Sequence, residues 1–177
     1  MKILIYLMVL LFASTQAKTQ SDRDTGLYEE KYRPQYHFSR KQGWMNDPCG
    51  LIYHKGQYHF YYWGHAVSED LLHWKHLPLV LEGNEKIGVM SGSAVIDRNN
   101  TSGFGSSDHP PVVAVYSMLR HSDRRQMQGI AYSTDQGRSF TRYPGNPVID
   151  IGSTSFRDPQ VFWHKPSGKW IMVVALS

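Results

Sequence analysis

The sequence predicts an all-β fold in which small antiparallel sheets repeat along the chain, as the blades of a β-propeller do. From Pro34 onward, short runs rich in Val, Ile, Tyr, Phe and Trp alternate with Gly, Pro, Asn and Asp. No window of helical length keeps an apolar stripe at i, i+3 and i+4, whereas short aromatic and β-branched runs between turn residues are typical of strands. Internal repeats of a few strands indicate propeller blades.

The first strands are expected behind a turn at residues 44–50, whose sequence is WMNDPCG. Pro fixes φ and Gly accepts φ > 0, so Asn-Asp-Pro-x-Gly is typical of a turn. The alternating apolar runs at 51–53 and 58–61 then predict a β-hairpin. Asp47 therefore lies where a loop enters a strand, a common place for a reactive side chain. A structural turn with a capping Asp is the alternative interpretation of these residues alone.

Two pairs of segments define the repeating unit. Asp47-Pro48 is followed by a Gly turn and a strand at 56–60, and Asp158-Pro159 is followed by the same pattern at 168–172. An Ala-x-Ser-x-Asp segment with an aromatic residue shortly after it also occurs twice. We expect its aspartate to form a turn between blade strands and the aromatic residue to lie in the blade core. These residues are Asp70 with Trp74, and Asp135 with Phe140.

The repeat has a consequence for Asp47 and Asp158, which would begin the innermost strands of two different blades. The innermost strand of each blade lines the central channel of a propeller. Both carboxylates would then face one axial funnel, although 111 positions separate them in the sequence. The repeat thus predicts that two carboxylates meet at one small site.

The amino terminus has the pattern of a secretory signal peptide at residues 1–17. Lys2 supplies the positive charge, residues 3–13 form an apolar run, and residues 15–17 offer small side chains for cleavage. The apolar run is too short to span a bilayer, and no other segment is long and apolar enough to do so. We expect a secreted protein with an amino-terminal arm at 18–33 and a partial β-propeller domain at 34–177.

The charge balance argues against a nucleic-acid partner. The net charge is +4, and loss of Lys2 with the leader lowers it to +3. The densest basic cluster, Arg120 with Arg124 and Arg125, also contains Asp123, so a solvated loop is favoured over a binding surface. We expect no nucleic acid, no membrane and no obligate protein partner.

Cysteine, asparagine and histidine each suggest a type of site. Cys49 is the single cysteine, so the chain cannot form an internal disulfide and its stability must come from its core. Asn99 and Asn100 begin two overlapping sequons and are glycosylation candidates. His73 and His76 lie three positions apart, but no carboxylate completes a zinc pattern, so solvated loop histidines are favoured. We predict no metal and no cofactor.

Four motifs in order resemble the signatures of family 32 glycoside hydrolases, the invertases and other β-fructofuranosidases. The resemblance runs from about Tyr36 to Ser177. It implies a five-bladed β-propeller followed by a β-sandwich, of which this chain holds an incomplete propeller with roughly the first blades only. The motifs are WMNDP at 44–48, WGHAVS at 63–68, SGSA at 91–94 and FRDP at 156–159.

The resemblance also implies roles for individual residues. Asp47 corresponds to the catalytic nucleophile, and Asp158 to the carboxylate that holds the fructosyl hydroxyls and stabilises the transition state. A retaining glycosidase attacks the anomeric carbon with such a carboxylate, through an oxocarbenium-like transition state. The implied substrate is a small carbohydrate, sucrose or another β-fructoside. For Asp158, an Asp-Pro turn with an Arg partner is the alternative. The implied substrate-binding residues are Trp44, Asn46, Ser91 and Arg157.

The sequence departs from the family pattern in several places. The family's acid/base is a glutamate in a Glu-Cys pair downstream of Arg-Asp-Pro, and every glutamate here precedes Asp158, so we expect the acid to be absent from this chain. A strand and loop with a sugar-binding Gln and Trp is expected to be missing before Trp63. Cys49 stands where Asn is usual, and Met90 where an aromatic residue is usual.

The leading hypothesis is a secreted glycoside hydrolase, or a piece of one, that releases terminal β-D-fructosyl residues by a retaining double displacement. We expect the chain to be an amino-terminal portion: a fragment, a truncated gene model or a decaying copy. The alternative is a catalytically inactive or degenerate carbohydrate-binding remnant of that family. A purely structural propeller gives no reason for two aspartates at matching positions of the repeat.

Overall fold

The computed structural model of the protein describes residues 30–34 and 36–177. The chain divides into two units, Met1–Arg33 and Pro34–Ser177. The expected signal peptide at 1–17, and the expected arm up to residue 29, lie outside the described residues. All the strands described lie in the second unit.

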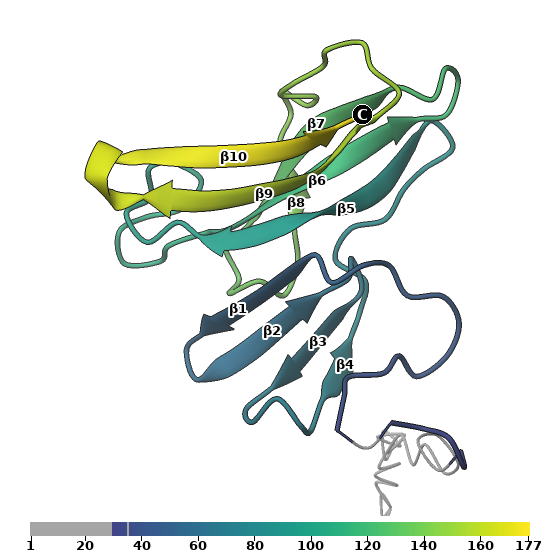
Figure 1. Ribbon diagram of the computed structural model, residues 1–177. Helices are drawn as coiled ribbons and strands as arrows, with labels where there is room; N and C mark the ends of the chain where they lie inside the picture. Colours follow the sequence, from purple (N-terminus) through teal and green to yellow (C-terminus); the bar gives the residue numbers. More distant parts are fainter. Residues whose placement is uncertain (1–29, 35) are drawn as a thin grey trace, which may run out of the picture. The chain divides into compact units, whose positions relative to one another are not determined.

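The second unit is an all-β structure, as the sequence predicts, and its described residues contain no helical element besides a short 3₁₀ turn, η1 (Lys165–Ser167). Two four-stranded antiparallel sheets follow each other along the chain, and a two-stranded hairpin comes after them (Figure 1). The first sheet contains β1 (Gly50–His54), β2 (Gln57–Tyr61), β3 (His65–Ser68) and β4 (Lys75–Leu77). The second contains β5 (Ile87–Ile96), β6 (Val112–Arg120), β7 (Gln126–Ser133) and β8 (Thr141–Arg142). The hairpin pairs β9 (Phe156–His164) with β10 (Lys169–Leu176).

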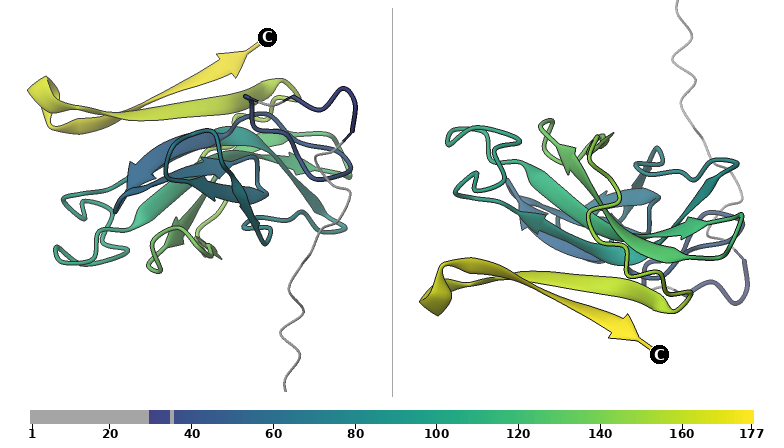
Figure 2. Two further views of the ribbon diagram at one scale, coloured as in Figure 1. Left: turned by 90° about the horizontal axis from the view of Figure 1, so that it is seen from below. Right: turned by 90° about the horizontal axis from the view of Figure 1, so that it is seen from above.

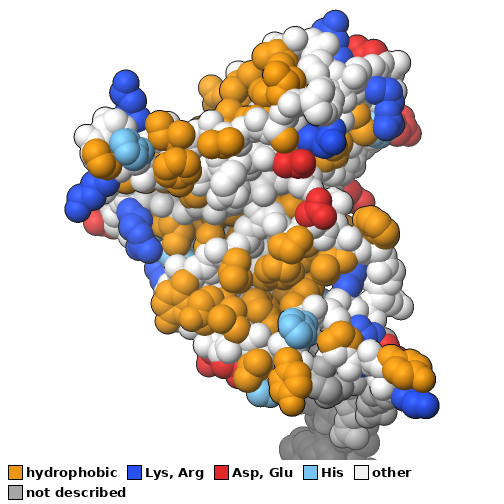
Figure 3. Space-filling model, in the orientation of Figure 1, with side chains coloured by type: hydrophobic (Ala, Val, Ile, Leu, Met, Phe, Trp, Pro, Cys, Tyr) orange, Lys and Arg blue, Asp and Glu red, His pale blue; other side chains and the backbone are white. Residues whose placement is uncertain are grey.

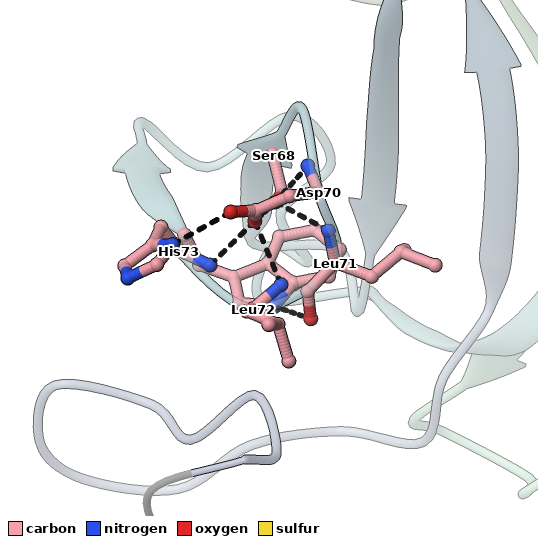
Figure 4. Close-up of polar contacts among 6 residues, drawn as sticks. Ser68, Asp70, Leu71, Leu72 and His73 are labelled. Carbon is pink, nitrogen blue, oxygen red and sulfur yellow. Dashed lines mark hydrogen bonds and ion pairs between the residues drawn. The ribbon is translucent and has the colours of Figure 1, made fainter.

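A hydrogen-bonded turn ends β3, at the first Ala-x-Ser-x-Asp segment (Figure 4). The Ser68 hydroxyl donates to the Asp70 carboxylate at 3.0 Å, and the backbone N–H groups of Leu72 and His73 donate to the same carboxylate at 2.8 Å. The His73 ring Nδ1 lies 2.6 Å from the other carboxylate oxygen. These bonds, led by the one to the His73 ring, hold the pKa of Asp70 well below its usual range. Asp70 is therefore a turn-forming residue.

The same turn recurs after β7. The Ser133 hydroxyl donates to Asp135 at 2.6 Å, and the backbone N–H groups of Arg138 and Ser139 donate to that carboxylate at 3.0 and 2.9 Å. A short polar side chain that accepts bonds from the following backbone stabilises a turn at the end of a strand. The predicted turn-forming role is thus confirmed for both aspartates.

The aromatic residues of the repeat also pack where the sequence predicts. Phe140 lies against the first core and meets the Tyr61 ring edge-on at 5.5 Å. Trp74 is half-buried, with its ring 5.7 Å from Phe60 and 5.5 Å from Phe38. Phe38 precedes the first sheet, so the Trp74 contact also holds the entering chain against that sheet.

Two hydrophobic cores lie on the two faces of β6. Its side chains alternate between the faces of the sheet, because successive residues of a strand point in opposite directions. Tyr116, Ala114 and Val112 belong to the core shared with the first sheet, whereas Val113 and Val115 belong to the core shared with the hairpin. Every residue from Val112 to Met118 is therefore buried.

The β9–β10 hairpin lies along one face of the second sheet (Figure 2). It is held there by side chains of that sheet, which accept hydrogen bonds from backbone N–H groups of β9. This arrangement fixes the start of β9 without strand-to-strand pairing. The acceptors are Gln126 Oε1 for Phe156 at 2.9 Å, Ser117 Oγ for Asp158 at 2.8 Å, and Ser93 Oγ for Val161 at 3.1 Å.

Candidate active site

The structure places three of the sequence-predicted site residues on or beside the first strand of three successive sheets. Asp47 comes just before β1, Ser91 lies in β5, and Asp158 is the third residue of β9. β1 packs against β5, and β5 against β9. Residues distant in the sequence are therefore carried on neighbouring strands, as the internal repeat predicts.

A direct hydrogen bond joins two of these residues. The Ser91 hydroxyl donates to Asp47 Oδ2 at 2.7 Å, across 44 positions of sequence. The register of β5 against β6 shifts between Val89 and Gly92, and such an irregularity can change the direction of a side chain. Gly92 itself has no room for a side chain, since a Cβ atom there would lie 2.0 Å from the Val115 carbonyl oxygen. The close approach of β5 to β6 at Gly92 therefore sets the position of Ser91.

The Cys49 thiol shows that Asp47 and Asp158 share one neighbourhood. Cys49 is buried, and its thiol lies 3.0 Å from the Asp47 carbonyl oxygen. Burial raises the pKa of Cys49 to about 11; hydrogen bonds from Gly92 and Ser91 oppose this, and the charges of Asp47 and Asp158 add to it. Both carboxylates thus lie close enough to act on one sulfur atom. The thiol stays protonated at neutral pH, so it is a packing group and not a nucleophile.

Asp158 occupies an unusual backbone conformation. Its φ is +62°, a region that side-chain-bearing residues rarely adopt. Its side chain is 48% exposed, and its Oδ2 lies 3.6 Å from Arg157 Nε. The Ser117 hydroxyl, fully buried, accepts the backbone N–H of Asp158 and holds this conformation in place. Nothing in the sequence around Ser117 marks this supporting role.

Trp44 and Asn46 line a pocket of about 260 Å³. Trp44 is 82% exposed, so its indole ring is available to a ligand. Arg40 and Glu82 line the same pocket, and sequence reasoning assigned no role to either. Both lie outside the four motifs, so only their spatial neighbours identify them.

The connection between β2 and β3 is short. Only residues 62–64 separate the two strands, which agrees with the expected missing segment before Trp63. Trp63 has a φ of +58°, is buried, and donates its indole N–H to the Met90 carbonyl at 2.6 Å. Trp63 also lines the Trp44 pocket, so this tight connection forms part of its wall.

The two sequon asparagines differ in their surroundings. The Asn100 side chain donates to the Gly105 carbonyl at 2.9 Å and accepts the Gly105 N–H at 2.8 Å. A glycan on Asn100 would displace both bonds, whereas Asn99 is exposed. Asn99 is therefore the more accessible of the two candidates, and its modification stays a prediction.

Residues 30–34 and 36–177 hold no group of three His, Cys, Asp or Glu side chains that could bind a metal ion. In this same part of the chain, no helix has the length and apolar character needed to cross a membrane.

Sequence comparison relates the chain to enzymes of known type. The sequence model described as "Glycosyl hydrolases family 32 N-terminal domain" matches residues 37–177. A levanase from Bacillus subtilis is 47% identical over 98% of this chain and 28% of its own length. An invertase from Debaryomyces hansenii is 42% identical over 98% of this chain and 35% of its own length.

Structural comparison agrees with the sequence. An extracellular exo-inulinase from Aspergillus awamori is 41% identical over 85% of this chain and 35% of its own length. A crystal structure of exo-inulinase from that organism has a TM-score of 0.77 and covers 83% of this chain and 36% of the solved chain. The chain thus spans about a third of the length of the relatives that it matches.

Proposed function

Because this chain belongs to glycosyl hydrolase family 32, we propose that the full protein hydrolyses terminal β-D-fructosyl groups of sucrose-type substrates by a retaining double displacement. The observation that carries the proposal is the pair of carboxylates, Asp47 and Asp158, beside one buried thiol. Both stand at the first strands of neighbouring sheets, and both are exposed to an incoming ligand.

In this proposal Asp47 attacks the anomeric carbon of the fructosyl group. The bond from that carbon to the leaving oxygen breaks as the Asp47 carboxylate oxygen forms a covalent ester, and water then releases fructose. The Ser91 hydroxyl holds Oδ2 of Asp47 and so limits the directions from which the carboxylate can attack. Trp44 and Asn46 would contact the substrate from their shared pocket.

Asp158 and Arg157 would stabilise the charge that develops during the reaction. A retaining glycosidase passes through a cationic transition state, to which a nearby carboxylate is attracted. Asp158 would also accept hydrogen bonds from fructosyl hydroxyls, with Arg157 orienting its carboxylate from 3.6 Å away. The reaction further needs an acid to protonate the leaving oxygen. Glu82, which lines the pocket of Trp44 and Asn46, is the glutamate that the structure brings near a predicted binding residue.

We also propose that the protein acts outside the cell. The signal-like sequence at residues 1–17 supports this, as does the name of the extracellular exo-inulinase from Aspergillus awamori. Secretion of the chain by its own leader into the culture medium would test it.

The test of the catalytic proposal is Asp47→Asn in the full chain. The amide cannot form the covalent ester, so sucrose turnover should fall by at least about 10⁴-fold. Asp108→Asn, the same change at an exposed aspartate outside these motifs, is the matched control and should leave turnover unchanged. Fructose binding should be measured on all three proteins. Turnover by Asp47→Asn at the parent rate would exclude Asp47 as the nucleophile, and binding without turnover by the parent would favour the non-catalytic alternative.

A further inference from the structure

A second concave region lies at the far end of β9 from Asp158. Asp158 is the third residue of this strand and Trp163 is the eighth, which places them roughly 15 Å apart along an extended chain. Three pockets of about 330, 330 and 410 Å³ meet there, and Trp170 of β10 lines each of them. None of the predicted catalytic or substrate-binding residues lines any of the three.

Two tryptophans form the floor of this region, which we call the Trp cleft (Trp163, Trp170 and the facing segment 97–102). The rings of Trp163 and Trp170 meet edge to face, with centroids 5.2 Å apart and an angle of 67° between the planes. Trp163 remains 36% exposed, an unusual exposure for so large an aromatic side chain. Exposed, fixed indole rings present flat apolar surface to a ligand.

A chain of hydrogen bonds fixes the orientation of Trp170. Its indole N–H donates to the Thr101 hydroxyl at 2.7 Å, and that hydroxyl donates in turn to the Asp97 carboxylate at 3.0 Å. Asp97 is 1% exposed and also accepts the Ser102 backbone N–H at 2.7 Å. Since the polar end of the ring is satisfied inside the protein, its face is left to the cleft.

The polar groups at the rim suit a neutral polyol. Arg98 and Asn99 line one of the pockets, and Lys169 lines another, so hydrogen-bond donors stand on both sides of the rings. Figure 3 shows Lys and Arg side chains beside hydrophobic ones at the tip of the β9–β10 hairpin, on the left. Sugars have this dual character, because their C–H groups pack on aromatic rings while their hydroxyls bind donors and acceptors.

We propose that the Trp cleft is a second carbohydrate-binding site, which holds a neutral oligosaccharide away from the catalytic residues. The choice of a fructose polymer as its ligand rests on the proposed function; the site itself rests on the tryptophans and their fixed orientation. Such a site would keep a long chain close to the protein and raise its effective concentration at the first site.

The test is affinity electrophoresis of the full chain in native gels that contain levan or inulin, at high ionic strength so that charge attraction is screened. The protein should come from a host without N-glycosylation, so that Asn99 carries no sugar. We expect Trp163→Ala to weaken the retardation constant about tenfold. The matched control is Phe162→Ala, a neighbouring 45%-exposed aromatic residue on the opposite face of the hairpin, which should be retarded like the parent.

Sucrose turnover, measured on the same samples, separates this proposal from the catalytic one. Trp163→Ala should keep the parent rate on sucrose, which is too small to use both sites, and thermal melting confirms that each variant is folded. An unretarded parent, equal retardation of parent and Trp163→Ala, or equal loss in both variants would overturn the second site. Retardation that depends on Trp163 in a protein without turnover would instead leave this site standing and contradict the proposed activity.

Discussion

At the scale of single residues, the Ser91–Asp47 hydrogen bond changes the role expected for Ser91. The resemblance implied a serine that touches the sugar, whereas its hydroxyl donates to a carboxylate of this chain. A serine in that position keeps the carboxylate in one rotamer and supplies one of the hydrogen bonds it needs when ionised. We therefore assign Ser91 a positioning role within the proposed mechanism.

Ser91→Ala tests this role. A hydrogen bond to a charged group contributes about 1.5–3 kcal/mol, so kcat on sucrose should fall by about 10- to 100-fold, with a smaller change in KM. Ser91→Thr keeps the hydroxyl and should recover much of the lost kcat. Steady-state kinetics on the three proteins give the answer. A kcat for Ser91→Ala within about twofold of the parent, or a change confined to KM, would return Ser91 to simple substrate contact.

At the scale of elements, the repeated Ser-x-Asp turns do more than reverse the chain. The turn after β7 reaches back to the first sheet, where the buried Tyr61 hydroxyl donates to the Gly137 carbonyl at 3.0 Å. Gly137 has a φ of +82°, and a Cβ atom there would lie 2.1 Å from that hydroxyl. One glycine thus supports both the turn and the packing of the two sheets.

Gly137→Ala should therefore destabilise the protein by about 2–4 kcal/mol, from the left-handed backbone conformation and the overlap with Tyr61 together. The control is Gly168→Ala, in the β9–β10 turn. Its φ is +61°, but nothing lies within 4 Å of the added atom, so about 1 kcal/mol is expected. Urea unfolding of both variants measures the difference. Equal losses of stability would show that the Tyr61 overlap is relieved at no cost.

At the scale of the whole molecule, a buried histidine pair connects the fold to pH. His59 and His65 are 2% and 0% exposed, and their ring nitrogens lie 3.1 Å apart. Burial is the main cause that lowers the pKa of His59 to about 4 and that of His65 to about 3, and the charge of Arg138 lowers both further. His54, also buried, has a lowered pKa for the same first reason.

The sign of the pH dependence follows from these shifts. Each histidine binds a proton near pH 6.5 when unfolded but only near pH 3–4 when folded, so stability is full above pH 6.5 and falls as the pH drops toward 4. The slope should approach about 1.4 kcal/mol per pH unit for each ring. The turn-forming aspartates, Asp70 and Asp135, have lowered pKa values, so their loss of stability is confined to lower pH.

Urea unfolding of the full chain between pH 7 and pH 4 measures this loss. His65→Gln cannot take up the proton and should show a shallower slope than the parent. His109→Gln, at an exposed histidine, should match the parent. A parent whose free energy of unfolding is constant over this range would contradict the assignment of neutral buried histidines.

The sequence by itself determined the fold class, the turn-forming aspartates and the pairing of Asp47 with Asp158. Each depends on local periodicity or on a repeat, and local backbone preference carries such information directly. Only the tertiary structure decided what lies across the sheets. Ser117 and Gln126 hold β9, Ser91 bonds Asp47, and the Trp cleft forms, because residues far apart in sequence meet when sheets pack. A single sequence contains no term for such contacts, since any Ser or Gln in a strand has the same local pattern whichever partner it meets.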